Sequence, residues 1–236
     1  MGSSKRVIER MDETVHEIVT RFDSFLERFN HSETFTGPSI YFHNKAIACL
    51  KRHRTSVDAI LSEELFDWIY ATLASWGMHR MGPGKTKLLP IEQIKQSVRA
   101  ERLLIEQLEN IDLPSVSTAD IGGISDQIWK LIQSIHVSAA EATIVANTKF
   151  LHHILPNLVP PIDRTYTYKC FYGRTNLSIS EQDAFQEVYG RFHQIAIAKR
   201  DRISQLIGAD WNTSSTKTID NVIVGRAIQR KEPIGA

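Results

Sequence analysis

Apolar residues along this chain recur mainly at intervals of three and four, the spacing that places side chains on one face of a helix. Alternation of apolar and polar residues, which is typical of strands, is scarce. Between residues 5 and 29, one apolar stripe consists of Val7, Met11, Val15, Ile18, Phe22, Phe25 and Leu26. The period therefore predicts an all-α, compact multi-helix domain with little or no sheet.

Helix start and stop residues, combined with this period, predict the remaining helices. Pro38 suits the first turn of a helix that ends in the basic residues 51–54. Ser62 suits the N-cap of a nearly apolar helix through Trp76, which we expect to be central and buried. Further helices are expected at about 90–111, 125–135, 139–155, 163–172 and 180–206, and from 216. Their predicted caps are Ser125, Asp163 and a Ser180/Asp183 capping box.

A linker is expected between Pro114 and Gly123. It could divide the chain into two helical lobes around a cleft, and we interpret it as a hinge at 112–124 within a single domain, 1–236. A chain of 236 residues fits one large domain or two small ones, and its 42% apolar content suffices for a packed core.

Charge and cysteine usage exclude several classes of protein. With 28 basic and 27 acidic residues, the formal net charge of +1 argues against a strongly basic nucleic-acid coat, although a local basic patch stays open. Cys49 and Cys170 form no disulfide framework, which favours a reducing compartment. No apolar run approaches the roughly 20 residues that cross a bilayer, and the N-terminus has no apolar signal core. We therefore expect a cytoplasmic protein with no membrane partner.

The stretch 147–164 is the most informative for function. Lys149 lies inside an otherwise apolar helix, and Asp163 follows fourteen positions later at the expected start of the next helix. Pro160 and Pro161 stiffen the loop between them. Because this loop turns the chain back, Lys149 and Asp163 could face one cleft.

Residues 146–167 resemble the end of the catalytic core of helix-hairpin-helix DNA glycosylases, especially divergent 8-oxoguanine-glycosylase-like members. In that family a helix-borne lysine is the nucleophile and an aspartate at the start of a later helix assists it. The resemblance implies these catalytic roles for Lys149 and Asp163, DNA as the partner, and base-excision repair by a hydrolase. A lysine attacks a sugar carbon only when neutral, and an apolar pocket disfavours the charged form. The target base leaves the helix stack for a pocket with aromatic walls, for which Trp76, Trp129 and Tyr166 are available.

The chain also departs from the family pattern. Family members place a Gly-x-Gly hairpin directly before the lysine, whereas residues 144–148 read Ile-Val-Ala-Asn-Thr, and the lysine-to-aspartate spacing is shorter than usual. In the alternative interpretation, Asp163 only caps a helix and Lys149 extends past its apolar stem to water. His152 and His153 then lie at the surface or the edge of the core. The chain would in that case be a non-enzymatic helical module that binds a protein or nucleic-acid partner.

A glycine-rich basic loop follows Trp76. Its residues 82–86, Gly-Pro-Gly-Lys-Thr, superficially resemble a phosphate-binding loop. The full nucleotide-triphosphatase pattern needs a glycine where His79 stands, and a preceding strand, so we exclude that class. Candidate contacts to the phosphate backbone are Arg80, Lys85, Lys87 and Arg164. The alternative is an ordinary solvated connection between helices.

Other chemistries find little support in the sequence. His43, Asn44 and Lys45 could line a pocket or be satisfied by nearby backbone. His152 and His153 are adjacent and diverge, so we predict no metal site and no cofactor. A serine hydrolase would need a Gly-x-Ser-x-Gly elbow and a sheet, and neither is expected. The sequence does not indicate an oligomeric state.

Overall fold

The computed structural model describes residues 2–32, 36–78, 87–140, 143–208 and 210–229. Within these ranges every regular secondary-structure element is helical. One isolated antiparallel β-bridge joins Leu88 to Ser138. The predicted all-α fold is therefore confirmed.

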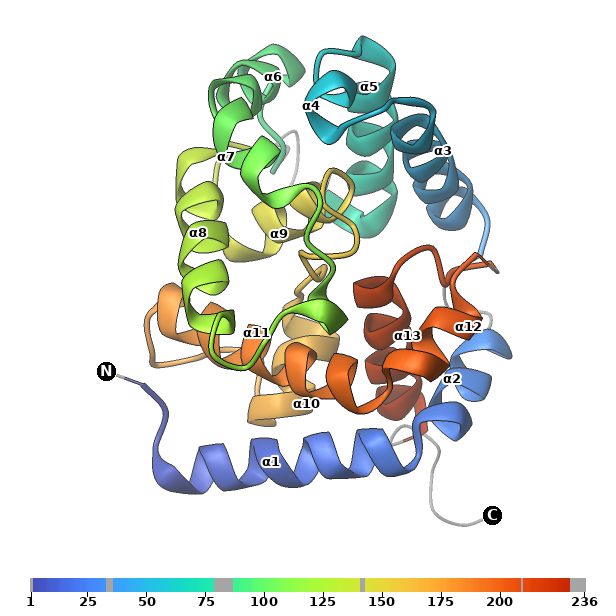
Figure 1. Cartoon of the computed structure of the whole chain (residues 1–236), viewed down its shortest axis with the longest axis vertical. Coiled ribbons are helices and arrows are strands. Elements are labelled where there is room, and N and C mark those ends of the chain that lie inside the picture. The colour runs from blue at the N-terminus through green and yellow to red at the C-terminus, as the bar shows by residue number, and fades with distance from the viewer. Residues whose placement is uncertain (1, 33–35, 79–86, 141–142, 209, 230–236) are drawn as a thin grey trace.

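Figure 1 shows α3 to α9 gathered in the upper part of the view, with α1, α2 and α10 to α13 below them. The segment η4 is a π-helical turn and η3 is a 3₁₀ turn, whereas η2 is a kinked turn in which Trp76 and Gly77 leave the helical φ/ψ region. The elements follow in this order: α1 (Lys5–Thr20), α2 (Phe22–Asn30), α3 (Pro38–Arg52), α4 (Ser56–Ala59), α5 (Glu63–Leu73), η2 (Ala74–Met78), α6 (Ile91–Ala100), α7 (Arg102–Leu108), η3 (Leu113–Ser115), α8 (Ile121–Ser134), α9 (Ile144–His152), η4 (Arg164–Tyr168), α10 (Lys169–Tyr172), α11 (Glu181–Ala198), α12 (Arg200–Leu206) and α13 (Ser215–Gln229).

Three helices that the apolar period predicts as continuous are each divided in two. The breaks fall at Arg21, Glu101 and Lys199, whose φ and ψ angles (−110° and 24°, −93° and 15°, −122° and 20°) leave the helical region. The apolar stripe continues across each break, so the period alone could not reveal the bends.

The predicted helix caps have mixed outcomes. Asp163 accepts a hydrogen bond from the Tyr166 N–H (2.6 Å) and Ser180 accepts one from the Asp183 N–H (3.0 Å), as capping residues do. Ser62 precedes α5 but makes no side-chain capping bond. The prediction for Ser125 is wrong: α8 already begins at Ile121, and the buried Ser125 hydroxyl has no hydrogen-bond partner among the described residues.

The segment 112–124, expected as a hinge, is anchored along its first half. The Leu113 N–H donates to the Asn157 carbonyl at 3.0 Å, and His193 Nε2 donates to the Val116 carbonyl at 2.8 Å. The Arg200 guanidinium donates to the Pro114 carbonyl. These bonds tie the segment to neighbours that are distant in sequence.

A continuous cluster of buried apolar side chains extends from Met11 in α1 to Ile223 in α13. The expectation that 62–76 forms the central helix is wrong, because Glu63, Glu64 and Asp67 expose one side of α5. The interior helix is instead α13, where residues 215–226 are all buried. Its polar composition hid this position from the sequence pattern.

Helix α13 crosses α2 at very short range. A Cβ atom added to Gly225 would lie 1.9 Å from the Phe25 carbonyl oxygen, so only glycine permits this crossing. The crossing fixes α13 against α2, and the first turns of α13 then reach the cavity that contains the candidate site.

Candidate active site

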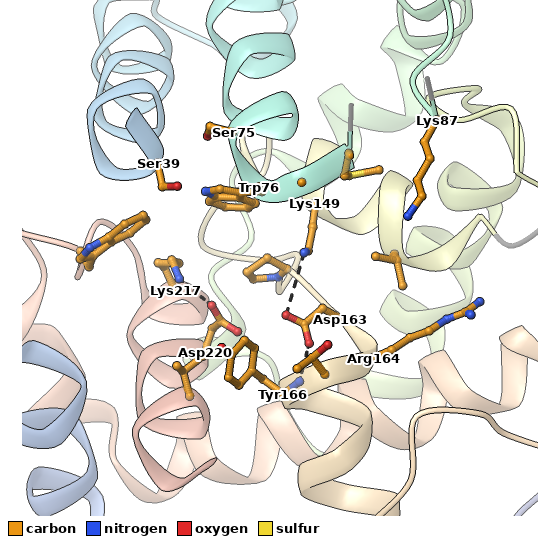
Figure 2. Close-up of a pocket in the computed structure, with 17 residues that line it drawn as sticks. Ser39, Ser75, Trp76, Lys87, Lys149, Asp163, Arg164, Tyr166, Lys217 and Asp220 are labelled. Atoms are coloured by element: carbon orange, nitrogen blue, oxygen red, sulfur yellow. Dashed lines mark hydrogen bonds and ion pairs between the residues drawn. The ribbon is translucent and has the colours of Figure 1, made fainter. Parts of the chain in front are cut away.

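A cavity of about 540 Å³ lies between the segments α3, η2 and α9 on one side and η4 and α13 on the other. This volume is within the range of small-molecule sites. Figure 2 shows charged side chains from both sides converging on it. Its aromatic lining residues are Trp76, Tyr166 and Trp211, and its charged ones are Lys87, Lys149, Asp163, Arg164, Lys217 and Asp220.

The structure brings Lys149 and Asp163 together in this cavity. Lys149 Nζ lies 3.9 Å from Asp163 Oδ2, and the two side chains are 13% and 20% exposed. The same amine lies 5.6 Å from the centroid of the Trp76 ring. Asp163 Oδ1 caps η4, which leaves Oδ2 directed at the lysine. Lys149 therefore contacts a carboxylate and an aromatic ring instead of extending into bulk water.

A second lysine–aspartate pair, which the sequence analysis missed, lines the same cavity. Lys217 Nζ lies 2.6 Å from Asp220 Oδ2, and these side chains are only 6% and 8% exposed. Burial raises the pKa of the Asp220 carboxyl, and the charge of Lys217 opposes this shift. Aromatic rings surround the amine, with centroids at 5.0, 5.8 and 5.9 Å in Trp211, Phe29 and Trp76. The i, i+3 spacing on α13 was the signal available in the sequence.

Three buried histidines lie behind the cavity wall. His43 is stacked against both Trp76 (5.8 Å between centroids, 27°) and Trp211 (5.2 Å, 25°). His152 and His153 are completely buried, so the expectation that they lie at the surface or core edge is wrong. His152 Nδ1 donates to the Val159 carbonyl at 2.9 Å, whereas the buried Nε2 of the same ring has no hydrogen-bond partner among the described residues.

A directed chain of hydrogen bonds fixes the tautomers of two of these rings. His153 Nδ1 donates to the Lys149 carbonyl at 2.8 Å, which makes its Nε2 the acceptor for His43 Nδ1 at 3.0 Å. His43 Nε2 then accepts from the Thr213 hydroxyl at 2.9 Å. Burial lowers the pKa of His43 and His152 well below the usual range, and that of His153 to about 4. The rings are therefore neutral at pH 7. The hydrogen-bond chain requires this, because one nitrogen of His153 and one of His43 must accept a hydrogen bond.

Some of the other candidate residues line the same cavity and some do not. Lys87 and Arg164 are exposed and line the cavity rim, whereas Arg80 and Lys85 lie outside the described residues. Tyr166 lines the cavity, and burial raises the pKa of its phenol. Trp129 does not line it; this ring packs against Phe185 in the core, with centroids 5.8 Å apart.

Across the ranges that the structure describes, no group of three or more His, Cys, Asp or Glu side chains is placed to hold a metal ion. No helix in those ranges combines the length and the apolar character needed to cross a bilayer.

Comparison with protein-family models, with curated proteins and with solved structures finds no match for this chain. The functional interpretation therefore depends on the residues and geometry of the cavity.

Proposed function

We propose that this chain is a base-excision DNA glycosylase in which Lys149 is the nucleophile and Asp163 the assisting carboxylate. The observation that carries the proposal is an amine and a carboxylate 3.9 Å apart in a cavity with aromatic walls. The resemblance of residues 146–167 to helix-hairpin-helix glycosylases assigns the same two roles.

The proposed reaction uses the neutral Lys149 amine. Its nitrogen forms a bond to the sugar carbon C1′ while the bond from C1′ to the base breaks, and the base leaves with the electron pair. One amine proton goes to the departing base, and the other goes to O4′ as the sugar ring opens, which leaves an imine. Asp163, the nearest carboxylate, relays these protons and stabilises positive charge on the sugar. Hydrolysis of the imine regenerates the amine.

The surroundings of this pair suit a nucleotide that has left the duplex. Trp76 and Tyr166 offer ring surfaces for an extruded base. Lys87 and Arg164 at the exposed rim suit contacts with flanking phosphates. Lys149 is the sixth residue of α9, so a glycine hairpin directly before it is absent, and we assign phosphate binding to these side chains instead.

Borohydride trapping tests the proposal directly. We would incubate the protein with duplexes carrying single damaged bases or an abasic site, and reduce any imine to a stable amine. We expect a covalent protein–DNA product with the wild type and none with Lys149→Ala. Asp163→Asn keeps an oxygen that can cap η4 and should slow the reaction by about 100-fold or more.

Lys95→Ala is a matched control, since Lys95 is also buried and paired, with Glu63 and Glu92 on the far α5–α6 surface. It should trap normally. Trapping that persists in Lys149→Ala would assign the nucleophile elsewhere. DNA binding with neither trapping nor base release would favour the non-enzymatic module.

Salt dependence tests the assigned phosphate contacts. The double variant Lys87→Ala/Arg164→Ala should bind all duplexes more weakly and reduce the slope of log K against log salt by about 2. An unchanged slope would place the DNA on another surface.

A further inference from the structure

We infer that Lys217 and Asp220 are the base-recognition pair of the cavity, and that they select a lactam edge, meaning a ring N–H beside an exocyclic carbonyl. The inference rests on the proposed function and adds the class of base. It also gives a role to a pair that the proposed reaction does not use.

The pair retains hydrogen-bonding capacity on the cavity side. An ammonium group has three N–H donors, and Asp220 Oδ2 uses one of those of Lys217. Asp220 Oδ1 has no hydrogen bond within the part of the chain that the structure describes. Both residues line the cavity, so together they present a donor beside an acceptor.

The position of Trp76 indicates how a base would lie. Its ring centroid is 5.6 Å from Lys149 Nζ and 5.9 Å from Lys217 Nζ, so one aromatic surface borders both amines. A base stacked on this surface can have its sugar carbon at Lys149 and its far edge at Lys217. Figure 2 shows the two amines below Trp76, with Tyr166 across the cavity.

The order of the two recognition groups determines which edge fits. Figure 2 shows Asp220 between Lys217 and Asp163, and the charges of both Asp163 and Lys149 act on the Asp220 carboxyl. Asp220 is therefore nearer the reacting end and Lys217 nearer the far edge. Going outward from the sugar along the base-pairing edge, the ring N–H (N3 of uracil, N1 of hypoxanthine) comes before the carbonyl at C4 or C6.

This order matches lactams and opposes amino-substituted bases. In uracil and hypoxanthine, as in thymine and guanine, the ring N–H faces the Asp220 carboxylate and the carbonyl accepts from Lys217. In cytosine and adenine, a ring nitrogen lone pair would face the carboxylate and an amino group would face the ammonium. Two mismatched polar contacts in a buried site are strongly unfavourable.

Matched substrates test this inference without any variant. Uracil differs from cytosine, and hypoxanthine from adenine, at this edge alone. We expect the wild type to release each lactam base at least 100-fold faster than its amino partner, from otherwise identical duplexes. Equal rates within either pair would overturn the inference.

Variants then assign the selectivity to these residues. Asp220→Asn should reduce the lactam preference at least 10-fold, because its amide can also donate, and Lys217→Gln should weaken release of lactam bases. A duplex with an abasic site carries no base to recognise, so imine trapping on it measures the effect of each variant on the chemistry alone, and we expect the change in lactam preference to be larger than the change in trapping. If a single variant does not fold, Lys217→Gln/Asp220→Asn leaves no unpaired charge and gives the same comparison.

The abasic duplex also separates the two ideas. If the wild type traps no abasic DNA, the proposed glycosylase function fails and the inference fails with it. If trapping is normal but the variants keep the full lactam preference, only the assignment to Lys217 and Asp220 fails. Parallel loss of trapping and base release, in correctly folded variants, would show that the pair supports the chemistry and not recognition.

Discussion

Helix α1 buries an apolar stripe and exposes its polar side, whereas α13 is buried on every side from residue 215 to 226. The two helices have 16 and 15 residues, so length does not explain the contrast. In α1, Met11 and Ile18 are completely buried and Asp12 and Glu13 are exposed. A one-sided helix of this kind needs no polar partners, because water solvates its other side.

The buried polar groups of α13 receive partners from distant parts of the chain. Arg226 donates to Glu17 of α1 at 2.7 and 2.9 Å. Thr216 donates to the Pro156 carbonyl at 2.7 Å. Unpaired, such groups would each cost a few kcal/mol. The comparison shows that α13 can be buried because distant residues provide hydrogen-bond and ion-pair partners for its polar side chains. Burial of α1 depends instead on the apolar area of one side.

The largest expected effect comes from removing one partner in α13. Asp220→Ala would leave the Lys217 charge buried without its carboxylate, and should lower the free energy of unfolding by about 3–5 kcal/mol. Urea denaturation measures this. Lys217→Met/Asp220→Leu removes both charges and should be near neutral or stabilising. A loss below about 1 kcal/mol in the single variant would contradict the dependence on partners.

Truncating the apolar side of α1 should cost somewhat less. Met11→Ala deletes a completely buried side chain, and we expect a loss toward the lower end of about 2–5 kcal/mol, because the outlying α1 can settle into the space. Glu13 is exposed on the same helix, so Glu13→Ala should change the free energy of unfolding by no more than about 0.5 kcal/mol. Equal losses in the two variants would refute the one-sided burial of α1.

Acidification should lower the stability of the folded chain through the buried histidines beside α13. The pKa of His153 is about 4 in the folded chain and 6.5 when unfolded, so the unfolded state binds the extra proton between these values. Stability should therefore fall as the pH drops from 6.5 toward 4, by about 2 kcal/mol at pH 5 for this residue alone.

Protonation of Asp220, whose pKa is raised by burial, acts in the opposite direction, so the informative quantity is a difference. His153→Asn removes one titrating ring and should flatten the loss of stability between pH 7 and 5. Identical pH profiles for the wild type and His153→Asn would contradict the assignment.

The smallest effect is expected on the outer side of α1. Lys5 and Glu9 form an ion pair at 3.8 Å, with the lysine side chain 91% exposed, and water screens such pairs. Lys5→Ala should leave the denaturation midpoint unchanged within error. A clear shift would mean that α1 depends on its polar side more than its burial pattern indicates.

Features set by local sequence could be predicted, and features set by distant partners could not. The all-α class, the start of α3 at Pro38 and the cap at Asp163 depend on neighbouring residues. The proximity of Lys149 and Asp163 also followed from one short loop. Recognising that Arg226 is buried would have required pairing it with Glu17, which is 209 positions away. The burial of His152 and His153 was missed for the same reason, because periodicity carries no sign of the groups that surround them. Lys217 was missed although its partner Asp220 is only three positions away, because nothing in the local sequence shows that the pair is buried.

The close crossing at Gly225 has a mechanical consequence. With no space for even a methyl group between α13 and the Phe25 carbonyl, α13 cannot slide along α2 without a steric clash. The side of the cavity that carries Lys217 and Asp220 should therefore move only together with α2. Thermal motion that widens the cavity would then fall mainly on the opposite side, where Gly77 adopts a φ of 83° at the end of the Trp76 turn. One wall of the cavity should therefore stay fixed, and any adjustment of the cavity to a bound molecule should come from the other wall.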